Sequence, residues 1–188
     1  MKDGGTLDRW LPEYRHNEVH ETVIAAPLEE VRRAVRGVRG REIPFARPLF
    51  FLRALPARLL GRPFPDRDHD RPILDVALAG GFILLANEPD AVVLGVVGRF
   101  WKLSGSIVRL AGPQEFLEFQ EEGYAKAAMD FTLTPLEDGR IRVRTETRIL
   151  PLGPEAARRF GLYWSIVHPG SAILRRMWLR AIRRRASR

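Results

Sequence analysis

The sequence contains no cysteine and only three lysines among its 31 basic residues. The absence of cysteine excludes disulfide bonds and thiolate metal ligands, and it fits a reducing compartment. The first ten residues, MKDGGTLDRW, lack the apolar core of a signal peptide. The most apolar stretch, residues 73–98, is interrupted by Asp75 and by the polar residues 87–90, so it is unsuited to span a membrane. We therefore expect a cytoplasmic protein.

Sequence motifs for nucleotide phosphates, dinucleotides and activated nucleophiles are also missing. Two stretches resemble metal-binding motifs without completing them. His16 and His20 have HExxH spacing, but Glu18 stands at the wrong position and the segment has the pattern of a strand. Residues 66–70 (DRDHD) begin like a calcium loop that lacks its later glycine and glutamate. We expect neither a metal nor a cofactor.

The net charge of +8 comes from one end of the chain. Residues 155–188 hold nine arginines and one acid, and the remainder holds 22 basic and 22 acidic residues. Such an end could contact an anionic membrane or, less readily, nucleic acid, which usually meets aromatic residues on a basic surface. The alternative is a solvated helix face that complements the helix dipole. The arginines proposed for a membrane are Arg175, Arg176, Arg180, Arg183, Arg184 and Arg185.

Residues 154–185 carry an apolar stripe at helical spacing, and they predict one long C-terminal helix. Pro154 and Glu155 suit its first turn. Pro169 and Gly170 are expected to kink or break it near the middle. The stripe consists of Phe160, Tyr163, Trp164, Val167, Ser171, Leu174, Trp178, Ala181 and Ile182.

Upstream of that helix, the pattern is mainly one of strands. Alternation of polar and apolar residues predicts an antiparallel sheet with one face exposed to water. A helix opens near Pro27 and ends by Gly37, and a turn is predicted at residues 137–139. Residues 44–65 suggest a short, proline-interrupted helix. The predicted strands are residues 16–24, 73–78, 82–87, 91–101, 114–121, 124–134 and 140–149.

Four motifs occur in an order that resembles a known superfamily. They are residues 24–31 (IAAPLEEV), 98–101 (GRFW), 145–149 (TETRI) and the helical segment 160–176. The chain thereby resembles the START-like helix-grip (SRPBCC) superfamily, in its polyketide cyclase/dehydratase branch. The resemblance implies an α+β fold in which about seven antiparallel strands wrap around the C-terminal helix. It implies one domain over residues 1–188, with residues 1–16 as a polar lead-in.

Members of that superfamily bind lipids, sterols, polyketides or plant hormones in an internal apolar cavity, and a minority catalyse cyclisation or dehydration. The resemblance thus implies a hydrophobic ligand, whereas the residues alone allow that the same side chains fill a solid core. The candidate ligand-binding residues are Arg99, Trp101, Met129, Phe131, Thr145, Thr147, Phe160, Tyr163, Trp164, Val167 and His168.

Two single residues and one pair of charged residues have two interpretations each. Arg99, which alternation places on the same strand face as Trp101, could hold a ligand carboxylate or pair with Glu118. His168 could be a buried structural histidine or an acid/base group beside the helix kink. Glu146 and Arg148 could be an acid–base pair, but alternation favours a solvated charge ladder away from the cavity. Three functions follow: ligand binding, a cyclase- or dehydratase-like enzyme, or lipid handling at a membrane surface.

Overall fold

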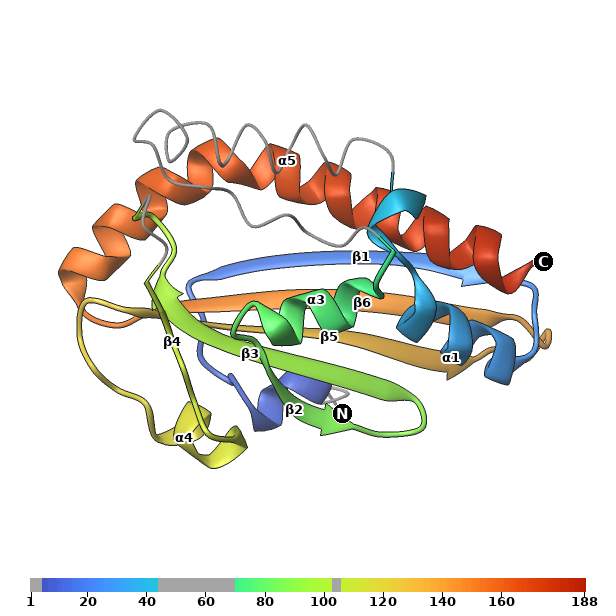
Figure 1. The fold of residues 1–188 in the computed structure, drawn as a ribbon, viewed down its shortest axis with the longest axis horizontal. Helices are drawn as coiled ribbons and strands as arrows, with labels where there is room; N and C mark the ends of the chain where they lie inside the picture. Colours follow the sequence, from blue (N-terminus) through green and yellow to red (C-terminus); the bar gives the residue numbers. More distant parts are fainter. Residues whose placement is uncertain (1–4, 44–69, 103–105) are drawn as a thin grey trace.

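A computed structural model describes residues 5–43, 70–102 and 106–188. Six antiparallel strands form one open sheet in the order β1-β6-β5-β3-β2, with β4 paired to β3 (Figure 1). The strands are β1 (His16–Ile24), β2 (Ile83–Asn87), β3 (Ala91–Arg99), β4 (Ser106–Val108), β5 (Ala125–Pro135) and β6 (Ile141–Pro151). The described part of the chain therefore has six strands, whereas about seven were expected.

Helix α5 (Pro154–Ala186) runs along one face of this sheet, which we call the inner face (Figure 1). Helix α1 (Leu28–Gly37) packs beside the C-terminal half of α5, and α3 (Ile73–Ala79) joins the same core. The alternation of β5 and β6 is confirmed, because Met129, Phe131 and Val143 point into this core. Among the described helices, none is long and apolar enough to cross a membrane.

The opposite, outer face of the sheet is not left to water as predicted. The single-turn helix η1 (Thr6–Arg9) and the short helix α4 (Pro113–Glu118) cover part of it. Leu7, Trp10 and Leu11 are buried there with Phe116 of α4. The expected polar lead-in thus contributes apolar residues to a second core.

Charged residues of the sheet lie under this cover, so the predicted solvated ladder is wrong. Glu146 is 2% exposed and Arg148 is 6% exposed. Arg148 Nε donates a hydrogen bond to Glu146 Oε1 over 2.7 Å, and Arg144 Nη2 donates to Glu146 Oε2 over 2.7 Å. Alternation gave the correct face, but it could not reveal that residues far away in the sequence would cover that face.

Two predicted strands are helices. Residues 73–79 form α3, whose N-cap is Pro72 and whose first turn contains Asp75. Pro113 begins α4 at a position where its missing N–H costs no hydrogen bond. Short apolar runs do not distinguish a strand from a buried helical turn. The expected helix within residues 44–65 lies outside the described residues.

Helix α5 continues unbroken through Pro169, so the predicted break does not occur. Pro169 cannot donate to the carbonyl of Ser165, and both residues lie on the solvent side of the helix. Water can therefore satisfy the carbonyl that the proline leaves without a partner. The hairpin between β5 and β6 is confirmed, with Gly139 at φ 78°, a conformation that favours glycine.

Candidate functional site

Strand β1 presents its even-numbered residues to the inner face, beneath α5. Ile24 enters the main core, whereas Glu18 and His20 bring polar groups to the middle of the strand. Glu18 is only 7% exposed, yet both of its carboxylate oxygens have partners. Its Oε1 lies 2.7 Å from His20 Nε2, and its Oε2 accepts a 2.9 Å hydrogen bond from the Ser171 hydroxyl of α5.

Arg175 reaches from α5 to the sheet one helical turn beyond Ser171. Its Nη2 donates a 2.7 Å hydrogen bond to Thr147 Oγ1 of β6 and lies against the Met129 sulfur of β5. Its Nη1 is buried and has no hydrogen-bond partner among the described residues. We call Glu18, His20, Thr147, Ser171 and Arg175 the polar cluster.

Burial lowers the pKa of Arg175 to about 10, although the charges of Glu18 and Asp130 oppose that shift. The guanidinium therefore stays protonated at neutral pH, in surroundings that stabilise the charged form poorly. A cation with a buried donor group that no described residue occupies is well suited to bind the carboxylate or phosphate of a ligand. The same nitrogen would otherwise carry a desolvation cost that no hydrogen bond offsets.

An aromatic cluster adjoins the polar cluster toward the N-terminal end of α5. Phe160 is 2% exposed, and its ring centroid lies 5.0 Å from that of His16 and 5.8 Å from that of Trp164. Trp101 packs edge-on against Phe160 at 6.3 Å, and Tyr163 lies at 5.7 Å. Burial, and then the charge of Arg15, lower the pKa of His16, which favours its neutral form. These rings provide an apolar wall beside the polar cluster.

The structure places most of the predicted site residues on the inner face. Met129 and Thr147 touch Arg175, and Phe131 packs against Trp178 at a centroid distance of 4.9 Å. Thr145 is also buried, but its hydroxyl donates to the Asp130 carbonyl of the neighbouring strand over 2.7 Å. The remaining members on this face are Trp101, Phe160, Tyr163, Trp164 and the half-buried Val167.

His168 is not a buried structural histidine, the first of its two interpretations. Its side chain is 44% exposed, and its Nε2 lies 4.0 Å from Glu18 Oε2. Its ring also packs against Trp164 at 4.9 Å. His168 therefore lies at the edge of the polar cluster, where it is accessible from solvent.

Arg99 lies apart from the other predicted site residues. Its guanidinium stacks over the Tyr124 ring at 4.2 Å, and Tyr124 belongs to the core of the outer face. The prediction that Arg99 and Trp101 share a face is wrong because β3 ends at Arg99 and the chain then turns. Trp101 consequently packs against Phe160 on the inner side.

Four members of the polar cluster were missed as site residues: Glu18, His20, Ser171 and Arg175. Arg175 was assigned to a solvent-exposed basic face, and this placement is corrected by its contacts with the sheet. The spacing of Arg175 does indicate the face of α5 that packs on the sheet. Arg175 stands four residues after Ser171 and three before Trp178, both on the predicted apolar stripe. Thr147 is the one member that alternation identified.

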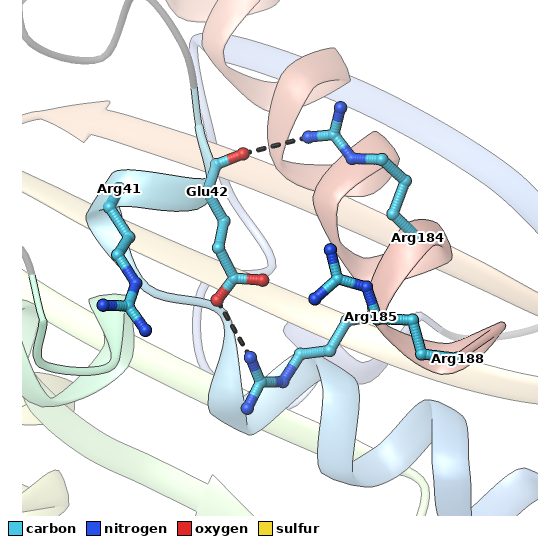
Figure 2. A pocket seen from close by; sticks show the side chains of 5 residues that line it. All are labelled: Arg41, Glu42, Arg184, Arg185 and Arg188. Atoms are coloured by element: carbon cyan, nitrogen blue, oxygen red, sulfur yellow. Dashed lines mark hydrogen bonds and ion pairs between the residues drawn. The ribbon is translucent and has the colours of Figure 1, made fainter.

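A pocket lies where η2 (Gly40–Glu42) meets the C-terminal end of α5 (Figure 2). It has a volume of about 450 Å³. Arg185 Nη1 donates to Glu42 Oε1 and Arg184 Nη2 donates to the Glu42 carbonyl, each over 2.9 Å. Its lining consists of Arg41, Glu42, Arg184, Arg185 and Arg188. Glu42 thus already occupies part of the hydrogen-bonding capacity of these arginines.

Within the described ranges, no group of three or more histidine, aspartate or glutamate side chains is arranged to hold a metal ion. Glu18 lies between two histidines. Its Oε1 is 2.7 Å from His20 Nε2, and its Oε2 is 4.0 Å from His168 Nε2. The side chains of the polar cluster can form hydrogen bonds and charge pairs and can transfer a proton.

No protein-family model matches the chain, and no curated protein sequence matches it significantly. The solved structures that match this chain include a hypothetical protein, jhp0584, from Helicobacter pylori. It has 10% identity and a TM-score of 0.38, and the match covers 95% of this chain and 93% of that chain. A conserved protein from Geobacillus kaustophilus has 12% identity and a TM-score of 0.41, and the match covers 92% of this chain and 95% of that chain. The protein TTHA0849 from Thermus thermophilus has 11% identity and a TM-score of 0.34, and the match covers 92% of this chain and 97% of that chain. At TM-scores below 0.5, these similarities carry no argument about fold, ligand or activity.

Proposed function

We propose that the protein is a START-like helix-grip protein that binds a small amphipathic molecule between the sheet and α5. The observation that carries the proposal is that Arg175 Nη1 is buried and has no hydrogen-bond partner among the described residues. In this interpretation, Arg175 binds an anionic group of the ligand, and the aromatic cluster around Phe160 contacts its apolar body. Lipid-, sterol- or polyketide-like molecules with an acidic group have this chemistry. A single domain and a cytoplasmic location remain part of the proposal.

Replacing Arg175 with methionine is expected to weaken binding of a long-chain fatty acid about 10- to 100-fold, the effect of one charge-assisted hydrogen bond. Binding of the matching fatty alcohol should change little, because its hydroxyl carries no charge. The measurement is the ligand-dependent shift in melting temperature over a titration of each compound. The Arg175→Met protein should still fold, because the apolar side chain removes the desolvation cost of the cation and loses only the hydrogen bond to Thr147 and the contact with the Met129 sulfur.

Arg176→Met provides the matched control, because Arg176 is the adjacent arginine but is exposed. It should bind the fatty acid like the wild type. Equal weakening by both substitutions would mean that the loss reflects overall charge, and it would contradict a specific role for Arg175. Absence of any shift with either compound would contradict the binding function itself for this ligand class.

The contact between Glu18 and His20 favours an enzyme as the second candidate. A carboxylate and an imidazole 2.7 Å apart on the inner face can exchange a proton with a bound molecule. An enzyme resembling polyketide cyclases or dehydratases would use this pair beside the Ser171 hydroxyl. If it is an enzyme, Glu18→Gln should abolish turnover of a bound polyketide while leaving its binding within about threefold. Unchanged turnover would exclude Glu18 as an acid or base.

A further inference from the structure

The solvent side of α5 carries an apolar stripe that no described residue covers. Leu162 is 68% exposed, Ile166 is 80% exposed and Ile173 is 49% exposed. Their spacings of four and seven residues place them on one side of the helix, away from Arg175 and the polar cluster. Large apolar side chains grouped on one exposed face usually mark an interaction surface.

Arginines flank this stripe at both ends of the same helix face. Arg158 and Arg159 precede it, and Arg176, Arg180 and Arg183 follow it, all exposed. The last three form no hydrogen bond or ion pair with another side chain in the described part of the chain. Glu155, the one acid on α5, pairs with Arg159 over 2.6 Å. The face is therefore apolar in its centre and basic at both ends.

We propose that this face of α5 docks onto an anionic lipid membrane, with Leu162, Ile166 and Ile173 entering the apolar boundary of the bilayer. Arginines beside an apolar stripe match the layered chemistry of such a surface, where lipid phosphates lie next to acyl chains. Nucleic acid would offer the phosphates without an apolar layer. The proposal does not depend on ligand binding at Arg175, which lies on the opposite side of the helix.

The test is co-sedimentation of the full chain with vesicles of phosphatidylcholine alone or mixed with phosphatidylserine. The wild type should bind the anionic vesicles and leave the neutral ones in the supernatant. Arg176→Gln, Arg180→Gln and Arg183→Gln together should weaken binding about 100-fold, and raised salt should weaken it further. Leu162→Gln, Ile166→Gln and Ile173→Gln together should weaken it at least about tenfold.

The matched control removes three exposed arginines outside α5 by Arg15→Gln, Arg33→Gln and Arg142→Gln. This control should retain binding within about threefold, because distant charges are screened. An equal loss in the control, or equal binding to neutral vesicles, would overturn the proposal.

Two other occupants of the stripe would give different results with the glutamine variant of its three apolar residues. If a second copy of the chain covers the stripe, that variant converts a dimer to a monomer in size-exclusion chromatography and leaves vesicle binding unchanged. If another part of the same chain covers it, the variant lowers the melting temperature and again leaves vesicle binding unchanged. Either result would overturn the proposal.

Discussion

Glu146→Gln is expected to lower the free energy of unfolding by about 3 kcal/mol, which corresponds to a fall in melting temperature of roughly 6–12 °C for a chain of this size. Glu146 is 2% exposed and accepts hydrogen bonds from Arg148, Arg144 and Asn17. Burial alone would raise the pKa of Glu146, but the hydrogen bonds from the two arginines outweigh it and lower that pKa. The carboxylate is therefore charged in the folded protein at neutral pH.

The cost arises because the substitution leaves Arg148 buried without its main counterion. Arg148 keeps a 2.5 Å ion pair with Asp8 and a 3.2 Å hydrogen bond to the Leu11 carbonyl, which is why we expect the lower end of the range for broken buried pairs. Urea denaturation at neutral pH measures the effect. The exposed Glu137→Gln serves as control and should change stability by less than about 0.5 kcal/mol. A loss below about 1 kcal/mol for Glu146→Gln would mean that solvent reaches the pair.

Asp130→Asn is expected to stabilise the protein at about pH 8 by up to about 3 kcal/mol and to have little effect below about pH 4. Asp130 is fully buried, and this burial raises its pKa to about 6. Its Oδ1 accepts a 2.8 Å hydrogen bond from the Glu146 backbone N–H, and its Oδ2 has no partner among the described residues. Asparagine keeps the first interaction and removes the charge.

The direction follows from the pKa of Asp130 in the two states. Asp130 binds its proton more tightly in the folded protein than in the unfolded chain, where its pKa has the ordinary value of 3.8. Protonation therefore favours folding, and this stabilisation is lost as the pH rises through about 6. Glu146, Arg144 and Arg148 surround position 130 in both proteins, so the difference in unfolding free energy between wild type and variant isolates the Asp130 carboxyl. A difference in unfolding free energy that is flat from about pH 4 to pH 8 would contradict the assignment.

Local patterns in the sequence were sufficient to predict the sheet and the helix that packs on it. Period-two alternation identified β1, β5 and β6 with the correct faces, and the helical stripe identified α5 to within one residue at its C-terminal end. The mistakes occur where local pattern is ambiguous. Residues 73–78 and 114–121 are short apolar runs that fit a strand or a helical turn, and the three-residue strand β4 is too short to have a pattern.

The candidate site was predicted only in its apolar part. The aromatic cluster follows from residue spacing on α5, but the polar cluster depends on contacts between β1 and α5, which are about 150 residues apart. Arg175 was misassigned because its charge was taken to indicate solvent exposure, although its spacing from Ser171 and Trp178 of the apolar stripe indicated the opposite. The burial of Glu146 and Asp130 was missed for a related reason, since it results from the packing of η1 and α4 on the outer face.

Ligand binding beneath α5 is tested most directly by mass spectrometry of the purified protein, first under native and then under denaturing conditions. We expect a stoichiometric bound molecule with an apolar body and an acidic group, released on denaturation and depleted in the Arg175→Met protein. A ligand-free native mass, together with no thermal shift across fatty acids, sterols and polyphenols, would contradict this function. The side chains between the sheet and α5 would then form a filled core.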